Sequence, residues 1–453
     1  MKKIFCLYIL LMGFVTGYAQ KASIPFQETI SHKQAIEDLD TLIFSLKEIH
    51  PALFMNRSEK SFNKAIKALK KALPEKDITV LEYYKIIKPI TSMFGEGHIQ
   101  LYIPDKEFEK YKIPAFPLSV KITPGKHTIY TAKNYYVNDK LVIEKGTQIL
   151  SINGKRDKSL ITQLLKYSQG ERDFFRCMYM ESCFTEHFYM LYPDSVFHLK
   201  LKTEKGVENK TIHAVSYSER QKPEWTDMWP PYSFKQLDKN VMLMTFKMCT
   251  PYNNPRAFAD SMFNIIKEKG ISNLIIDIRK NPGGSSSVGD EFFQYISHVP
   301  FQQFGKGLCK YSTPMKKSFK KAGYDYDSIP NGVIEEPEEE LIPLRENPLR
   351  FNGKVYLLTS YKTYSSAASF SWAFKYFNMG TTVGEETGGM NVSSGEVITQ
   401  ELPSSHIMYG IPCKLFYQYG ADGSHIHGTL PDVKVPQEKA LEKALQLIAT
   451  SEK

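Results

Sequence analysis

The feature that most constrains the fold is an alternation of apolar strands and helical segments in the second half of the chain. From about residue 216 onward, short apolar runs alternate with amphipathic stretches, in the order "NVMLMTF", "FADSMFNIIKEKG", "NLIIDIR", "KVYLLTS", "SWAFKYFNMG" and "TTVGEE". This order is typical of a sheet of largely parallel strands joined by helical crossovers. The sequence therefore predicts an α/β core over residues 216–450.

Two other patterns precede this core and indicate a multi-domain chain. Over residues 25–112, apolar positions recur three and four apart, as in "AIEDLDTLIFSLKEIH", which predicts a small helical domain. Over residues 113–215, short alternating runs such as "PLSVKI", "TIYTA" and "TQILSI" are separated by Gly, Asn and Lys turns, which predicts a β-rich domain. A polar stretch from about 300 to 350 carries "EEPEEE"; we expect a solvated loop there, with a lid or a docking insertion as the alternatives.

The first 19 residues are typical of a secretory signal peptide. Lys2 and Lys3 precede the apolar run "IFCLYILLMGFV", and Gly17-Tyr18-Ala19 forms a small-x-small cleavage site. No later run approaches the roughly 18 apolar residues that a membrane span needs. We therefore expect an exported protein, periplasmic or secreted, without a membrane span.

Composition excludes several classes of protein. The net charge of +9 becomes +7 once the two lysines of the signal segment are removed, and acidic residues lie between the remaining lysines. A nucleic-acid-binding protein would show a clustered basic stripe instead. Beyond the signal segment the cysteines are odd in number and scattered, so they indicate neither a disulfide framework nor a zinc site; they are Cys177, Cys183, Cys249, Cys309 and Cys413. We also expect no cofactor and no other metal site.

The stretch "KTYSSAASF", residues 362–370, is the first candidate for chemistry. It lies between an apolar run and a predicted helix, so its hydroxyl residues occupy a strand-to-helix turn. An amide in the first turn of a helix is free to stabilise charge on an attacked carbonyl. Serine is also among the commonest helix caps, and the local sequence by itself favours capping over a nucleophile.

Two further segments have the residue types that a serine nucleophile requires. "LIIDIRKNPGG" ends in Gly283-Gly284, where the backbone can approach a ligand closely, although a tight turn that precedes a helix explains the same residues. "FGEGHIQL" places His98 in a glycine-flanked turn after a helix. A histidine is the usual base for a serine, but spacing alone cannot connect His98 to the serines.

In order along the chain, these segments resemble the serine peptidase family that contains the C-terminal processing proteases and tricorn protease, in particular its tricorn-like, histidine-using branch. The resemblance covers nearly the whole chain after the signal segment and rests on "FGEGHIQL", "KGTQILSINGK", "LIIDIRKNPGG", "TYSSAASF" with "VGEETGG", and "DGSHIHGTLPDVKVP". It implies a PDZ-like domain at 113–215 and a Clp-protease/crotonase-like catalytic core at 216–450.

The resemblance also implies a role for particular residues. By the family pattern Ser365 is the nucleophile, with Ser366 as the alternative, and the Ser366 amide is an oxyanion donor together with Gly283 or Gly284. The processing-protease branch uses a lysine base, but "GGMNVSSGEV" contains none, so His98 is the implied base.

For the acid that orients this histidine the candidates are Glu396, Asp422 and Glu96, of which Glu396 is preferred. Two positions depart from the family pattern. Ala368 stands where the family has glutamate, and Gly97 where the tricorn branch has serine.

The implied function is that of an exported serine endopeptidase acting on peptides or proteins. A peptide partner is expected for the PDZ-like domain, because such domains bind an extended strand at a sheet edge. Two alternatives remain open: a peptide- or lipid-binding protein on the same scaffold without turnover, and an esterase that uses the same serine and histidine.

Overall fold

The computed structural model describes residues 28–103, 105–223, 228–336 and 339–451. The predicted signal segment, residues 1–19, lies outside the described residues. Within the described ranges, no helix has the length and apolar character that crossing a bilayer requires.

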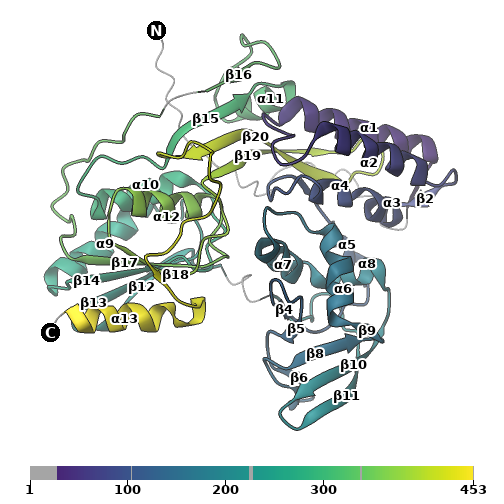
Figure 1. Cartoon of the computed structure of the whole chain (residues 1–453), viewed down its shortest axis with the longest axis horizontal. Helices are drawn as coiled ribbons and strands as arrows, with labels where there is room; N and C mark the ends of the chain where they lie inside the picture. Colours follow the sequence, from purple (N-terminus) through teal and green to yellow (C-terminus); the bar gives the residue numbers. More distant parts are fainter. Residues whose placement is uncertain (1–27, 104, 224–227, 337–338, 452–453) are drawn as a thin grey trace.

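The predicted α/β core is present as a six-stranded sheet in the order β12-β13-β14-β17-β18-β21 (Figure 1). Every neighbouring pair from β13 to β21 is parallel, and only β12 is antiparallel to its neighbour. The strands are β12 (Tyr232–Asp238), β13 (Val241–Phe246), β14 (Asn273–Asp277), β17 (Lys354–Thr359), β18 (Thr381–Gly384) and β21 (Val433–Lys434).

Helices cover both faces of this sheet because its strands are apolar on both sides. Leu274 and Ile276 of β14 pack in one cluster with three helices, whereas Ile275 between them packs on the other face with a fourth. The first three helices are α9 (Pro255–Glu268), α10 (Ser286–Ile296) and α12 (Ser366–Tyr376), and the fourth is α13 (Ala440–Ser451), drawn in yellow in Figure 1.

A second sheet, in the order β16-β15-β20-β19, extends from this core and includes part of the stretch expected to be a loop. Its strands are β15 (Phe304–Lys310), β16 (Ile334–Glu335), β19 (Val392–Glu401) and β20 (Met408–Gln418), and α11 (Thr313–Lys321) follows β15. The expectation of a solvated loop over 300–350 is therefore wrong for residues 304–310, 313–321 and 334–335 of that stretch, which form β15, α11 and β16. Its polar composition hid β15, which pairs with β20 along most of its length.

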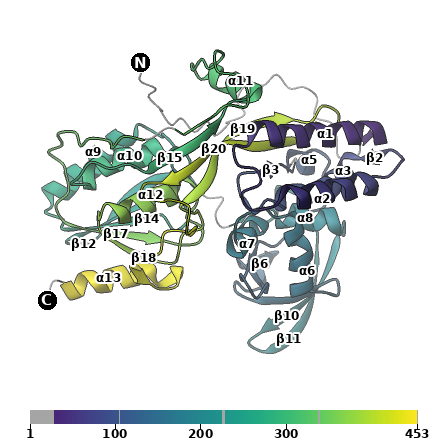
Figure 2. The ribbon, with the colours of Figure 1, turned by 45° about the horizontal axis from the view of Figure 1, so that its top comes forward.

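The N-terminal helices form where their sequence predicts, and their buried faces pack on the second sheet (Figure 2). Capping boxes start two of them, at Ser31 with Gln34 and at Thr79 with Glu82. Their apolar residues share one cluster with Ile398 and Tyr409 of the second sheet. The helices are α1 (His32–Ile49), α2 (Glu59–Ala72), α3 (Val80–Ile87) and α4 (Pro89–Ser92), beside the short pair β1 (Thr29–Ile30) and β2 (Ile78–Thr79).

The segment 113–215 forms a separate sheet, β11-β10-β8-β5-β4, with its own apolar cluster. The strands are β4 (Val120–Ile122), β5 (Ile129–Thr131), β8 (Gln148–Ile152), β9 (Lys155–Arg156), β10 (Val196–Thr203) and β11 (Gly206–His213), with the separate pair β6 (Tyr135–Val137) and β7 (Lys140–Ile143). The β-rich reading missed a helical stretch between β9 and β10: α6 (Asp157–Leu164), the 3₁₀ turn η1 (Leu165–Tyr167), α7 (Asp173–Ser182) and α8 (Phe184–Leu191).

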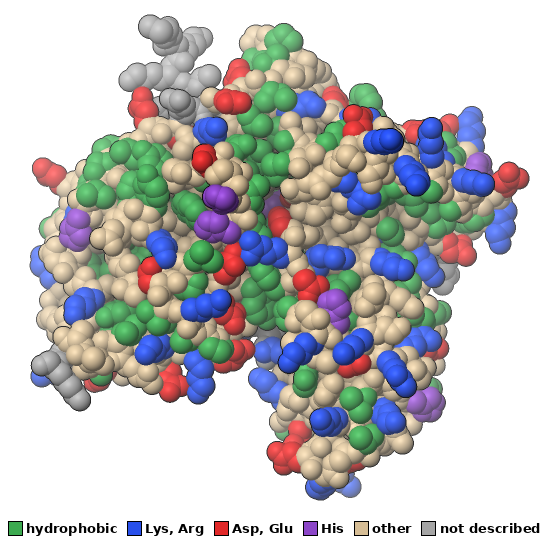
Figure 3. All heavy atoms as spheres, viewed as in Figure 1, with side chains coloured by type: hydrophobic (Ala, Val, Ile, Leu, Met, Phe, Trp, Pro, Cys, Tyr) green, Lys and Arg blue, Asp and Glu red, His purple; other side chains and the backbone are tan. Residues whose placement is uncertain are grey.

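The connection from α4 to this sheet brings the turn around His98 onto the second sheet. The two-residue strand β3 (Gln100–Leu101) pairs with Tyr409 and Gly410 of β20, and α5 (Asp105–Lys110) follows it. At the other end of the chain, the 3₁₀ turn η3 (Gln437–Lys439) leads into α13. Lys and Arg side chains are scattered among acidic ones on the face seen in Figure 3, as the sequence indicates.

Candidate active site

Ser365 occupies a strained turn between β17 and α12. Its φ of 51° and ψ of −132° are rarely adopted by a residue with a side chain, and such strain costs about 1–3 kcal/mol. Hydrogen bonds on both sides hold the turn: the Thr363 hydroxyl donates to the carbonyl of Ile278 at 2.9 Å, and the Tyr364 amide donates to the carbonyl of Asn281 at 3.0 Å. The neighbouring strand β14 and its turn thus force the conformation that directs Ser365 out of the helix.

The side chain of Ser365 meets an imidazole rather than an amide of its own helix. Ser365 is the N-cap residue of α12, but it makes no side-chain capping hydrogen bond there. Its Oγ lies 3.3 Å from Nε2 of His98. The capping interpretation that the local sequence favours is therefore wrong for Ser365. The Ser366 hydroxyl is occupied elsewhere, donating to the carbonyl of Gly284 at 2.6 Å.

A carboxylate lies at the other nitrogen of the histidine, and it belongs to Glu96. His98 Nδ1 is 3.3 Å from Glu96 Oε1, and the His98 amide donates to the same oxygen at 2.6 Å. The preferred sequence candidate, Glu396, instead pairs with Lys414 at 3.8 Å. The acid beside His98 is therefore Glu96, and the prediction of Glu396 is corrected. The pairing of β3 with β20 brings the turn that contains Glu96 and His98 to the nucleophile.

A second buried histidine, which the sequence reasoning missed, lies behind Glu96. The Ala52 amide donates to Nδ1 of His50 at 3.0 Å, so in neutral His50 the proton is on Nε2. That nitrogen is 3.6 Å from Glu96 Oε2 and 3.4 Å from the Ser394 hydroxyl. His50 follows α1 in an otherwise ordinary "IHPA" context, so no sequence signal marked it.

This arrangement shifts the pKa values of both members of the Glu96–His98 pair. Burial by itself would raise the pKa of Glu96, but hydrogen bonds with His50 and His98 outweigh burial and lower the pKa to about 2. Burial would lower the pKa of His98, but the Glu96 carboxylate outweighs it and raises that pKa above its ordinary value. A negative Glu96 therefore favours the imidazolium that forms when His98 accepts a proton.

Tyr364 and Glu171 complete the surroundings of the imidazole, and neither was predicted. The Tyr364 ring stacks on His98 at 5.1 Å between centroids, and its hydroxyl donates to Glu171 Oε1 at 2.8 Å. The same carboxyl oxygen accepts the Gly97 amide at 3.2 Å. A Cβ added to Gly97 would lie 2.2 Å from the Tyr364 hydroxyl. The serine that the tricorn branch has at this position does not fit here.

The predicted oxyanion donors come together beside Ser365, with one correction. A Cβ on Gly283 would lie 2.6 Å from Cβ of Ser365, so the glycine turn approaches the nucleophile closely. The Gly283 amide itself donates to Asn281 Oδ1 at 2.9 Å and is therefore engaged. The amides of Gly284 and Ser366 donate in none of the hydrogen bonds found among the described residues, which leaves them as the candidate donors.

A small pocket of about 30 Å³ opens beside the nucleophile. Ser365 and Ser366 line it, as does Glu396 of β19, so the residue predicted as the orienting acid lies in the wall of this cavity. Ala368, where the family has glutamate, is 3% exposed and packs closely on Gly389: a Cβ added to that glycine would lie 2.6 Å from the Ala368 Cβ.

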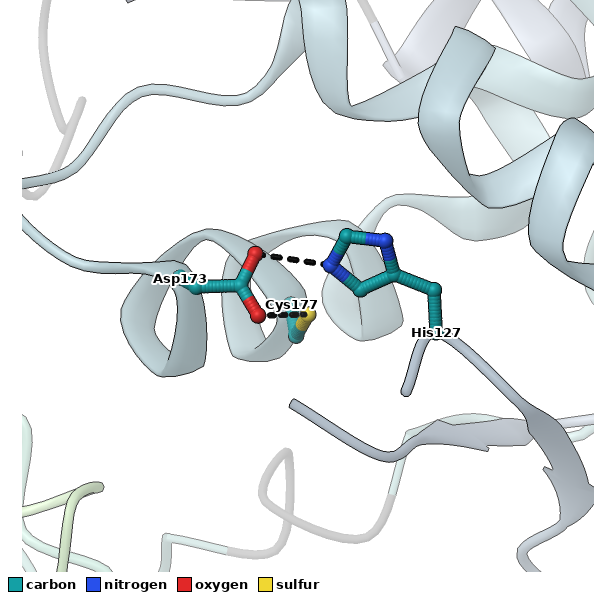
Figure 4. Close-up of side chains that lie close together, drawn as sticks. All are labelled: His127, Asp173 and Cys177. Carbon is teal, nitrogen blue, oxygen red and sulfur yellow. Dashed lines mark hydrogen bonds and ion pairs between the residues drawn. The ribbon is translucent and has the colours of Figure 1, made fainter. Parts of the chain in front are cut away.

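A second cluster of polar side chains lies in the β-rich segment (Figure 4). His127 Nε2 is 2.8 Å from Asp173 Oδ1, and Cys177 Sγ is 3.8 Å from Asp173 Oδ2. The Gly125 amide also donates to Asp173 Oδ2, at 2.6 Å. An imidazole and a backbone amide therefore already use both carboxylate oxygens, which explains the cluster as a link between a β-turn and the start of α7.

A mixed α/β fold that places a serine, a histidine and a carboxylate in series defines the class of serine hydrolases. Residues 240–435 match the family model described as peptidase family S41. Over residues 240–435 the sequence is that of peptidase family S41, a family of serine-type peptidases. The matched residues include Ser365 and the Gly283-Gly284 turn, whereas Glu96 and His98 lie outside them.

Solved structures of low sequence identity have a similar architecture. Mature CPAF shares 12% identity over 92% of this chain and 95% of its own, with a TM-score of 0.63. The structure of mature CPAF complexed with lactacystin shares 11% identity over 93% of this chain and 97% of its own, also with a TM-score of 0.63. The photosystem II D1 C-terminal processing protease shares 13% over 91% and 96%, at a TM-score of 0.47, too low to support an argument. The likeness to CPAF shows a common fold over nearly the whole chain.

Proposed function

We propose that this chain is an exported serine endopeptidase with Ser365 as nucleophile, His98 as base and Glu96 as the acid that orients the base. The observation that carries the proposal is the strained Ser365 with its hydroxyl 3.3 Å from His98 Nε2, in line with Glu96 on Nδ1. Export is proposed from the signal-like residues 1–19. The PDZ-like and Clp-protease/crotonase-like assignments, with the boundaries 25–112, 113–215 and 216–450, are part of the same proposal.

The proposed reaction begins with attack of Ser365 Oγ on the scissile carbonyl while His98 Nε2 accepts the hydroxyl proton. The carbonyl oxygen becomes an oxyanion that accepts hydrogen bonds from the Gly284 and Ser366 amides. Loss of one such donor typically costs about 3 kcal/mol of barrier. His98 then returns the proton to the leaving amine as the C–N bond breaks, and water repeats the sequence on the acyl-enzyme.

Glu96 contributes by orientation and charge. It holds Nδ1 of His98 as the protonated nitrogen, so that Nε2 presents its lone pair to Ser365. His50 in turn positions Glu96 from the far side. In this scheme Glu96 stays ionised while the imidazole gains and loses the proton, which agrees with its lowered pKa.

Labelling with a fluorophosphonate tests the proposal against a binding protein that has no turnover. We expect the wild-type protein to become labelled on the tryptic peptide that contains Ser365, because only an activated serine attacks the phosphorus. Mass spectrometry of the digest locates the adduct. A protein that binds peptides without turnover would remain unlabelled and would contradict the proposal. Comparing kcat/KM for a peptide library and for simple esters separates a peptidase from an esterase.

The pH dependence of kcat/KM gives a further prediction. His98 must be neutral to accept a proton, and its pKa is raised above the ordinary 6.5. Activity should therefore rise with pH through a midpoint above 6.5 and fall away below it. A pH–rate profile from pH 5 to 9 measures this midpoint. A midpoint well below 6.5 would contradict the role of the Glu96–His98 pair.

A further inference from the structure

The cavity beside Ser365 lies on one side of the reacting atoms. Ser366, whose amide is a proposed oxyanion donor, and Ser286, which follows the glycine turn, both line it together with Ser365. His98 is not one of the described residues that line the cavity. The leaving amine receives its proton from His98, so the amine side of the substrate faces the imidazole. The cavity therefore lies on the acyl side of the scissile bond.

Glu396 enters this cavity from an unusual position in its strand. Its φ is 56°, a left-handed conformation in the middle of β19, between the paired residues Gly395 and Val397. Non-glycine residues rarely adopt this conformation, and it concentrates at functional sites. Its side chain lines the cavity and is only 14% exposed.

The carboxylate of Glu396 is able to accept hydrogen bonds from a ligand. The Lys414 Nζ atom lies 3.8 Å from Glu396 Oε2, a distance longer than a hydrogen bond. The two charges therefore attract each other without forming a hydrogen bond at that distance. Burial raises the pKa of Glu396, and Lys414 offsets part of that effect. A cation bound against the carboxylate would favour its ionised form.

The remaining walls suit a long side chain with a polar end. The rings of Phe304 and Phe416 lie 4.8 Å apart between centroids and provide apolar surface for methylene groups. Ser393 and Ser394, two small polar residues of the same strand, also line the cavity. Lysine and arginine combine an apolar stem with a cationic end, whereas an acidic side chain would be repelled by Glu396.

We propose that this cavity binds a lysine or arginine side chain on the acyl side of the scissile bond, and that Glu396 is the residue that selects it. The inference rests on the proposed peptidase function and adds the substrate class. It also gives Glu396 a role in specificity in place of the catalytic role predicted from the sequence.

Two diphenyl phosphonates test the proposal, one with the side chain of lysine and one with that of norleucine, which keeps most of the stem but lacks the ammonium group. In each, Ser365 Oγ attacks phosphorus, a phenoxide leaves, and His98 transfers the serine proton to it. We expect the wild-type protein to react with the lysine analogue about 10- to 100-fold faster than with the norleucine analogue. In Glu396→Gln the ratio should fall close to one.

Controls separate this inference from the proposed function. A fluorophosphonate without a recognition side chain should label wild type and Glu401→Gln at similar rates, and it should still label Ser365 in Glu396→Gln. Glu401→Gln, an exposed position on the same strand, should keep the wild-type lysine preference. If the fluorophosphonate fails to label the wild type, the proposed function itself is wrong. If it labels but the two diphenyl phosphonates react equally with the wild type, the cavity does not select a basic side chain and the inference is overturned. If the wild type prefers the lysine analogue and Glu396→Gln keeps that preference, the assignment of Glu396 is overturned.

Discussion

Ser365→Ala should abolish fluorophosphonate labelling and lower kcat for peptide hydrolysis by about 10⁴-fold or more, the scale of loss when a serine nucleophile is removed. The physical reason is that the Ser366 hydroxyl, the nearest alternative, donates to the Gly284 carbonyl at 2.6 Å. The residual rate should come from the oxyanion amides and substrate binding alone. Labelling stoichiometry and steady-state kinetics measure the two effects.

Two serine variants on the same helix serve as controls for this result. Ser366→Ala removes the hydroxyl but keeps the amide, so we expect labelling to persist with a loss of roughly tenfold or less in kcat/KM. Ser371→Ala removes a buried hydroxyl that has no hydrogen-bond partner among the described residues, and it should leave activity unchanged. Labelling that survives Ser365→Ala and disappears in Ser366→Ala would move the nucleophile by one residue.

Glu96→Gln should lower kcat by about 10³- to 10⁴-fold while the protein stays folded, because neutralising the acid of a serine triad costs about that much. The amide oxygen can still accept the His98 backbone N–H, but the charge that favours the imidazolium is gone. The amide nitrogen would face His50 Nε2, another donor, and this adds to the disorientation of the side chain.

The pH profile of Glu96→Gln distinguishes loss of charge from general damage to the site. Without Glu96, burial is the largest remaining influence on His98 and it lowers the pKa. The acid limb of kcat/KM should therefore shift to lower pH than in the wild type. Glu401→Gln, which changes an exposed glutamate on β19, is the matched control and should keep the wild-type acid limb. An acid limb that shifts in Glu396→Gln as it does in Glu96→Gln would restore the sequence-based choice of acid. Thermal unfolding of each variant confirms that it is folded.

Sequence reasoning found the parts of the site that lie in strongly patterned segments. The strand-to-helix turn at Ser365 and the glycine turn at 283–284 both follow apolar strands of the parallel sheet, and the carboxyl ends of such strands meet at one edge. The α/β alternation is therefore consistent with the proximity of the two turns in the structure. The choice of Ser365 over Ser366 and of His98 as base depended on the family resemblance, and the geometry now supports both.

The residues that contact His98 could not be predicted from sequence patterns. Glu96 was one candidate among three, and His50, Glu171 and Tyr364 were not considered. His50 and Glu171 lie far from the serine in sequence and have no distinctive context. Their proximity depends on the packing of the N-terminal helices on the second sheet and on the position of α7. Such contacts between distant segments leave no periodic signal in the sequence.

The sequence by itself therefore determined the α/β core, the α-helical N-terminal segment, and the turns that carry Ser365 and His98, because hydrophobic periodicity and turn chemistry are local properties of the chain. Only the tertiary structure decided that Glu96 rather than Glu396 faces His98. The pairing of β3 with β20 brings the Glu96 turn to the nucleophile, and a left-handed residue in β19 puts Glu396 into the neighbouring cavity. The first result depends on strand pairing between residues about three hundred positions apart, and the second on local backbone strain. Neither leaves a periodic pattern in the sequence.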